Sequence, residues 1–249
     1  MNFFFHINLF FIILILTSKT FAQNQIVADL SQENVEISTD FQGAKILLFG
    51  AYEGKKGDDI VVIVTGPKGL VTLQKKEKIF GVWVNTKKVN YINAPKYLSI
   101  SSNRKINDIL NKKTQMISEI GLDNLKIRIQ PGIKVDNQNN WRQALTRNML
   151  KSNLWSINEN SVNLNKDSLF RSYLKLPSNV ITGEFEVKIL HYRNSKLVSQ
   201  QINSINVSKS GISADIYFIA QNYSTLYGIF AVLLAVLVGW GSNLIFRKV

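Results

Sequence analysis

Residues Leu226 to Phe246 read LYGIFAVLLAVLVGWGSNLIF, the longest uncharged apolar run of the chain. Its twenty-one residues carry no charge, and twelve of them are Leu, Ile, Val or Phe. A helix of this length reaches roughly 31 Å, enough to cross a hydrocarbon core of about 30 Å. The apolar residues favour insertion by roughly 4 to 7 kcal/mol. We predict a membrane-spanning helix over 226–246. The alternative, a buried core helix, normally carries a polar stripe at this length.

The charges that follow this helix orient it. Arg247 and Lys248 come directly after the apolar run, and basic residues stay on the cytoplasmic side of a membrane. We therefore expect a cytoplasmic tail over 247–249 and the rest of the chain on the other side.

The N-terminus predicts export. Phe3–Leu16 is an apolar run of fourteen residues, too short to span comfortably, and Thr20 and Ala22 suit positions −3 and −1 of a signal-peptidase site. We predict a signal peptide over 1–22, cleaved between Ala22 and Gln23. The alternative is an uncleaved anchor, because no basic residue precedes the run.

Composition favours a bacterial periplasm. The chain has no cysteine, so an exported domain would be held by its core alone. The predicted exported part holds twenty-seven Lys and Arg against seventeen Asp and Glu, scattered along the chain. An anionic lipid or ligand could use this charge, but a codon bias toward Lys and Asn explains it as well. The compartment disfavours nucleic acid. The expected location is the bacterial inner membrane, with a single span.

Short strands separated by turn residues predict a mainly β fold, an immunoglobulin-like antiparallel sandwich over 23–102. Ile46–Phe49 and Ile60–Val64 are apolar runs fit for central strands, and Gly66–Gly69 is a turn. Phe80, Val82 and Val84 are expected to face the core, with Trp83 on the opposite face.

Between 103 and 160 the apolar period changes to that of a helix, which predicts a helical or mixed insertion. One helix is expected from Ile106 to Ile120 with Gly121 as C-cap. A second contains Trp141, Leu145 and Met149, with Asn140 as a possible N-cap.

Strand patterns return over 161–210, and Glu184–Ile189 alternates strictly. The pattern leaves open whether these strands complete the first sandwich or form a second small β unit; we favour the second unit. A juxtamembrane helix is expected over 211–225, leading into the membrane helix.

Catalytic, metal and cofactor sites lack support. A Ser-His-Asp triad would depend on His191, the only histidine of the exported part, and zinc sites need three or four ligands. Neither a Walker A loop nor a Gly-x-Gly-x-x-Gly is present in the sequence. We predict a protein that is not an enzyme and has no cofactor or metal.

Two candidate interaction sites remain. Lys75, Lys76, Lys78, Trp83 and Asn85 form a basic stretch with a Trp on the side opposite the core, which could anchor a partner. It could equally pack beneath a loop. In the membrane helix the small residues Ala231, Ala235 and Gly239 fall four residues apart, a spacing that lets another helix pack closely.

The chain resembles the alphaproteobacterial putative transmembrane protein family. The segments that carry the resemblance are Ile26–Ser31, Leu48–Ala51, Val64–Pro67, Gly81–Asn85, Leu169–Arg171, Leu176–Pro177 and Leu226–Gly228. It implies a signal sequence, an exported body and one C-terminal helix, and it implies no catalytic residues. It also implies a neighbouring gene for a permease of the sulfite-exporter type, and therefore a multi-span permease as a partner.

Two functions are expected from these observations. The first is a non-enzymatic single-span protein whose periplasmic part binds a partner and serves a membrane permease. The second is a free-standing receptor or binding module for a small anion or glycan.

Overall fold

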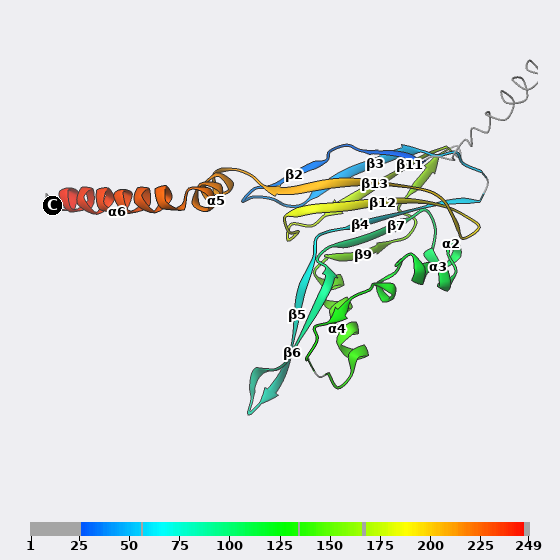
Figure 1. The fold of residues 1–249 in the computed structure, drawn as a ribbon, viewed down its shortest axis with the longest axis horizontal. Helices are drawn as coiled ribbons and strands as arrows, with labels where there is room; N and C mark the ends of the chain where they lie inside the picture. Colours follow the sequence, from blue (N-terminus) through cyan, green and yellow to red (C-terminus); the bar gives the residue numbers. More distant parts are fainter. Residues whose placement is uncertain (1–25, 56, 134, 166–167, 247–249) are drawn as a thin grey trace, which may run out of the picture.

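The strand Asp58–Thr65 (β4) lies at the centre of the body, because its run Ile60–Val64 is apolar on both faces. The computed structural model describes residues 26–55, 57–133, 135–165 and 168–246. Within it, every residue of β4 except the last is buried. β4 belongs to sheet B, whose strands are, in spatial order, β2 (Asn34–Ile37), β13 (Lys196–Lys209), β12 (Gly183–Arg193), β4, β7 (Leu98–Ser102) and β9 (Trp155–Asn158). A strand buried on both faces needs a covering layer on each side, and both layers are present (Figure 1).

Sheet A covers one face of sheet B and forms a sandwich with it. Its strands are, in spatial order, β1 (Val27–Leu30), β3 (Ala44–Ala51), β11 (Leu169–Leu176) and β10 (Asn163–Asn165). β11 alternates between exposed and buried residues along its whole length, as expected for a sheet with one solvated face. The side chains between the sheets include Ile46, Leu48, Phe185, Val187 and Ile189, all fully buried.

The two strand regions of the chain form one sandwich, which corrects the prediction of a separate β unit over 161–210. β11 pairs with β3 along its whole length, with Leu174 opposite Ile46. β12 pairs with β4, with Ile189 opposite Val62. An interior strand such as β4 must satisfy two hydrogen-bonding edges, and the early strands supply only one of them. The sandwich is mainly antiparallel, but β2 pairs with β13 and β7 pairs with β9 in parallel.

The other face of sheet B is covered by a mixed layer of strands and helices. It contains sheet C, made of β5 (Lys68–Ile79), β6 (Val82–Pro95) and β8 (Arg128–Ile129), with the helices α2 (Ile106–Ile109), α3 (Lys112–Ile117), η1 (Leu122–Asn124) and α4 (Gln138–Lys151). A second core fills the space beneath them, with Trp155, Ile100 and Leu145 almost fully buried. The Trp155 indole Nε1–H donates to the Pro95 carbonyl at 2.9 Å, so this large side chain leaves no polar atom unpaired.

The helices differ from the sequence prediction at their ends. The stretch from Ile106 to Ile120 is broken at Leu110, which is extended with φ −126°, and Asn111 then caps α3 by accepting from the Thr114 N–H at 2.9 Å. In α4 the N-cap is Asn137, which accepts from the Asn140 N–H at 3.1 Å, so Asn140 is a donor inside the helix. Asn side chains compete for nearby backbone groups, and several asparagines offer equivalent caps.

The C-terminal part leaves the end of β13 as two helices, α5 (Ile212–Asn222) and α6 (Ser224–Phe246), which meet at Tyr223. Tyr223 has φ −131° and ψ 47°, so the helix is interrupted there. Among the described residues, α6 is the one helix long and apolar enough to cross a membrane, and its Ser224–Asn243 window is not buried by the body. The predicted candidate membrane helix is confirmed.

Candidate interaction surfaces

β5 and β6 continue beyond the body as a two-stranded hairpin (Figure 1). Near the body its inward residues Leu73, Val89 and Tyr91 are buried in the second core. From residue 82 to 88 every residue of β6 is exposed. Here both faces of the hairpin are open to solvent.

The hairpin tip, residues 79–84, is exposed to solvent. The prediction that Phe80, Val82 and Val84 face the core is therefore wrong. Phe80 is fully exposed, Val82 is 65% exposed and Trp83 is 67% exposed. Phe80 and Gly81 form the turn between the strands and do not begin a new core strand. The alternation of apolar residues is the same for a core strand and for a free hairpin, so the pattern alone did not separate them.

The turn itself is unusual. Phe80 has φ +49° and Gly81 has φ +84°, the left-handed conformation that two-residue hairpins require at both positions. Asn, Asp or Gly normally occupies the first of these, because a bulky side chain is disfavoured at positive φ. Residues held in such conformations cluster at functional sites, so Phe80 is a candidate functional residue.

The hairpin register groups most of the predicted surface on one face. Trp83 lies opposite Lys78 and Asn85 lies opposite Lys76, in two cross-strand pairs separated by the pair Glu77 and Val84. Because residues two apart on a strand share a face, these four side chains lie together. Lys75 lies on the other face, where it forms a 2.6 Å ion pair with Glu77.

A lysine collar surrounds the base of the tip. It consists of Lys75, Lys76, Lys78, Lys87 and Lys88. Lys75 pairs with Glu77 and Lys87 pairs with Asp136. Within the described part of the chain, salt bridges to Lys76, Lys78 and Lys88 are absent. Three positive charges of the collar are therefore uncompensated.

A basic cleft lies between this hairpin and α4, with a volume of about 440 Å³. Its lining includes Lys75, Lys76, Lys87, Arg147, Trp141, Asn137, Asn140 and Asn148. Cationic groups, amides and an aromatic ring are the groups that bind anions and sugars. Asp136 also lines the cleft and engages Lys87 there.

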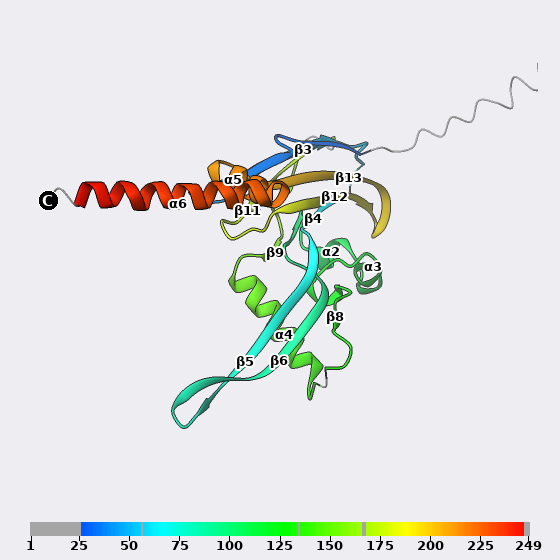
Figure 2. The ribbon, with the colours of Figure 1, turned by 60° about the vertical axis from the view of Figure 1, so that its left-hand side comes forward.

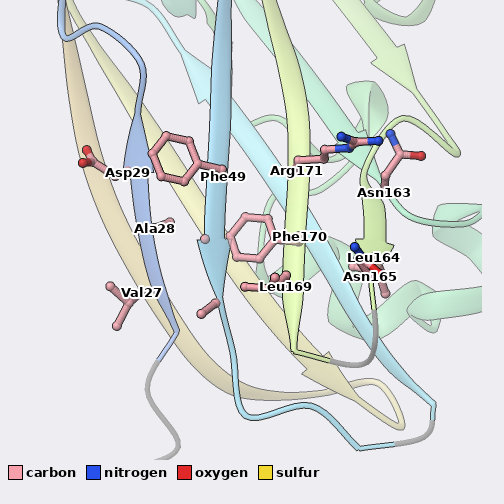
Figure 3. A pocket seen from close by; sticks show the side chains of 12 residues that line it. Val27, Ala28, Asp29, Phe49, Asn163, Leu164, Asn165, Leu169, Phe170 and Arg171 are labelled. Carbon is pink, nitrogen blue, oxygen red and sulfur yellow. The ribbon is translucent and has the colours of Figure 1, made fainter.

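A broader hollow of about 760 Å³ lies on sheet A (Figure 3). The Phe170 ring fills the space beside Gly50, where a Cβ would come within 2.7 Å of it. Figure 3 shows Arg171 and Asn163 on neighbouring strands at one side of the hollow and Asp29 at the other. Its polar groups are spread over the sheet and do not converge on one point, so it supports no specific chemistry.

His191 takes part in a buried charge cluster. Its Nε2–H donates to Asp58 Oδ2 at 2.9 Å, and Nδ1 lies 3.2 Å from Ser199 Oγ. Asp58 also accepts from Arg193 Nε and Nη2 at 2.6 and 2.7 Å and from the Lys55 N–H at 2.7 Å. The order Ser199, His191, Asp58 resembles a hydrolase triad. However, the Arg193 guanidinium already compensates this carboxylate and the imidazole is fully buried, so we interpret the cluster as a clamp between β4 and β12.

Small residues gather on one side of α6. They are Ser224, Gly228, Ala231, Ala235, Gly239 and Ser242, spaced three or four apart. This spacing places them on one helix face, which includes the predicted Ala231, Ala235 and Gly239. We name these six residues the small-residue face. Leu233 and Leu237 lie on the opposite side and are exposed.

The sequence predicted some residues of these surfaces and not others. The lysines and Trp83 were identified, whereas Phe80 was missed as a surface residue. The signal that could have found it is Phe-Gly between two alternating runs, each beside lysines. The predicted cleavage site, Ala22 and Gln23, lies outside the described residues.

Comparison with known proteins places the chain in a family. A family model described as "Putative transmembrane protein (Alph_Pro_TM)" matches residues 25–248, which include both the β body and α6. No curated protein matches the chain. Because the match extends over nearly the whole sequence, the chain belongs to this transmembrane protein family, which is alphaproteobacterial by name.

Proposed function

We propose that this protein is a non-enzymatic, single-span protein of the bacterial inner membrane that serves as an accessory partner of a multi-span permease. Its β-rich body lies in the periplasm and its C-terminus in the cytoplasm. The body carries surfaces suited to binding, and the only histidine described is used in a buried clamp.

The observation that carries this proposal is the unburied α6, whose small-residue face has no neighbour in the described structure. At Gly228 and Gly239 a Cβ would meet nothing within 4 Å. Lipid tails are as apolar as leucine, so helices associate in membranes mainly by close packing at such faces. Ile216 and Ile219 of α5 lie beside Leu233, on the side of α6 opposite to the small-residue face, so α5 leaves that face open.

We expect the triple variant Ala231→Leu, Ala235→Leu, Gly239→Leu to lower co-purification of the permease about tenfold, because packing of this kind contributes about 1 to 2 kcal/mol. The measurement is crosslinking in intact cells, followed by detergent extraction and mass spectrometry of the partners. Leu233→Phe with Leu237→Phe adds bulk to the opposite face and should leave the complexes intact. Unchanged complexes in the triple variant would refute the helix-packing part.

The basic cleft favours a second candidate, a receptor for a small anion or glycan. It predicts saturable binding of inorganic phosphate or of an acidic trisaccharide to the full chain in detergent, measured by calorimetry. Arg147→Gln with Lys76→Gln should weaken this binding about tenfold, and Lys188→Gln, outside the cleft, should not. Failure of both ligands to bind would remove this candidate.

A further inference from the structure

The exposed hairpin tip has no cover in the described body. Its apolar residues Ile79, Phe80, Val82, Trp83 and Val84 are all at least 43% exposed. Scattered apolar residues need no explanation, but a contiguous group at the end of a projecting hairpin marks an interaction site. Two of its members are aromatic, the residue type that anchors proteins at membrane interfaces.

The position of Phe80 strengthens this conclusion. The turn places its whole side chain beyond the last cross-strand pair, Ile79 and Val82, at the extreme end of the hairpin. Asn or Gly would satisfy the same backbone without strain. Phe80 therefore lowers the stability of this turn relative to Asn or Gly. Its presence indicates that the side chain contacts something other than this folded chain.

The lysine collar sits directly behind the tip. An apolar end followed by uncompensated lysines matches the order of a bilayer leaflet, in which acyl chains lie beneath anionic headgroups. The long lysine side chains can reach the headgroups while the tip enters the interface.

The direction of the hairpin indicates which surface its tip contacts. Figure 2 shows α6 lengthwise, and both α6 and the hairpin leave the body toward the same side. In this view the hairpin tip lies well to one side of α6. Along the direction of the α6 axis, the tip is level with a point within that helix. A bilayer crossed by α6 would therefore lie on the side of the body toward which the hairpin tip points.

We infer that the hairpin tip inserts into the near leaflet of the same bilayer that α6 crosses, with the lysine collar on its anionic headgroups. This inference rests on the membrane anchoring in the proposed function and adds a second contact with the membrane. Two separated contacts fix the orientation of the body, because a single helix lets it rotate and tilt.

The test uses the full-length chain, which contains no cysteine, so Val82→Cys accepts one environment-sensitive fluorophore. The labelled protein is reconstituted into phosphatidylethanolamine and phosphatidylglycerol vesicles that carry a spin-labelled quencher lipid. We expect quenching at residue 82 several-fold above that at Leu197→Cys. Leu197 is 48% exposed and lies at the end of β13 remote from α5.

Two sets of variants separate the contribution of Phe80 to membrane insertion from that of the collar lysines. Phe80→Asn should leave the unfolding midpoint of the body unchanged or raised, because Asn tolerates positive φ, while insertion falls about tenfold. Lys76→Gln, Lys78→Gln and Lys88→Gln should weaken insertion about fivefold per lysine in anionic vesicles and much less in phosphatidylcholine. Lys105→Gln, Lys151→Gln and Lys175→Gln make the same charge change elsewhere and should have little effect.

The outcomes are distinguishable. A chain that fails to float with vesicles contradicts the membrane anchoring of the proposed function. A chain that floats while residue 82 stays as exposed as residue 197 overturns only the hairpin inference. Shielding of residue 82 in native membranes but not in pure lipid vesicles would assign the tip to a protein partner, and would also overturn it.

Discussion

Replacing Asp58 with Asn is expected to lower the free energy of unfolding by about 3 kcal/mol. The Asp58 side chain is 1% exposed and binds His191, Arg193 and the Lys55 N–H. The substitution leaves the Arg193 charge without its partner inside the β4–β12 clamp. Arg193 keeps 23% of its side chain exposed, which places the cost at the low end for a broken buried pair.

The same residue should make the protein sensitive to acid. Burial raises the pKa of Asp58, but the hydrogen bonds from Arg193, the Lys55 N–H and His191 outweigh it and hold this pKa well below the usual 3.8. The unfolded chain then binds more protons than the folded chain once the pH falls below about 4. The stability from Asp58 is complete above its unfolded pKa and is lost as the pH falls toward the folded pKa.

Urea unfolding between pH 7 and pH 3 measures both effects. The Asp58→Asn variant should unfold at lower urea at pH 7, and its loss of stability below pH 4 should be smaller than that of the unchanged protein. Asp136→Asn is the control, because Asp136 pairs with Lys87 on the surface with 82% of its side chain exposed. Equal stability of the Asp58 variant and the unchanged protein at pH 7 would contradict the clamp.

Replacing Leu233 and Leu237 with Arg is expected to release the protein from the membrane. Both residues lie near the centre of α6, where each arginine costs about 2.5 to 3.5 kcal/mol. Together they remove the roughly 4 to 7 kcal/mol that the apolar residues of 226–246 contribute to insertion. Both are exposed on the side of α6 opposite to the small-residue face, so the folded body is not involved.

Carbonate extraction of membranes gives the measurement. The double variant should appear in the soluble fraction, whereas Asn243→Arg, near the end of α6, should stay in the membrane because arginine there can reach the interface. Thermal unfolding of the body should be the same in all three proteins. A double variant that unfolds while remaining sedimentable would instead identify α6 as part of the folded core.

The hairpin shows how local pattern can mislead. Phe80, Val82 and Val84 have the alternation of a core strand, yet they lie at or next to the turn between β5 and β6. Figure 1 shows these two strands projecting from the body as a hairpin. An alternating pattern indicates that one face of a strand is apolar, but it does not indicate which element covers that face. The broken helix at Leu110 has a related cause, since Asn111 offers a cap that competes with helical continuation.

Features that depend on neighbouring residues and on solvent can be predicted from the amino-acid sequence. The length and apolarity of 226–246 predict α6, and the run Ile60–Val64 predicts a central strand; the structure confirms both. These properties follow from helix rise, strand alternation and transfer from water.

The pairing of distant strands and the exposure of particular surfaces become visible in the three-dimensional fold. β12 joins β4 across more than one hundred residues, and this pairing creates the Asp58 clamp. The hairpin tip became a candidate surface because no other element covers it in the described structure. Long-range pairing depends on the competition among all strand edges for hydrogen bonds and on the fit of side chains between sheets, and neither quantity is contained in a local pattern.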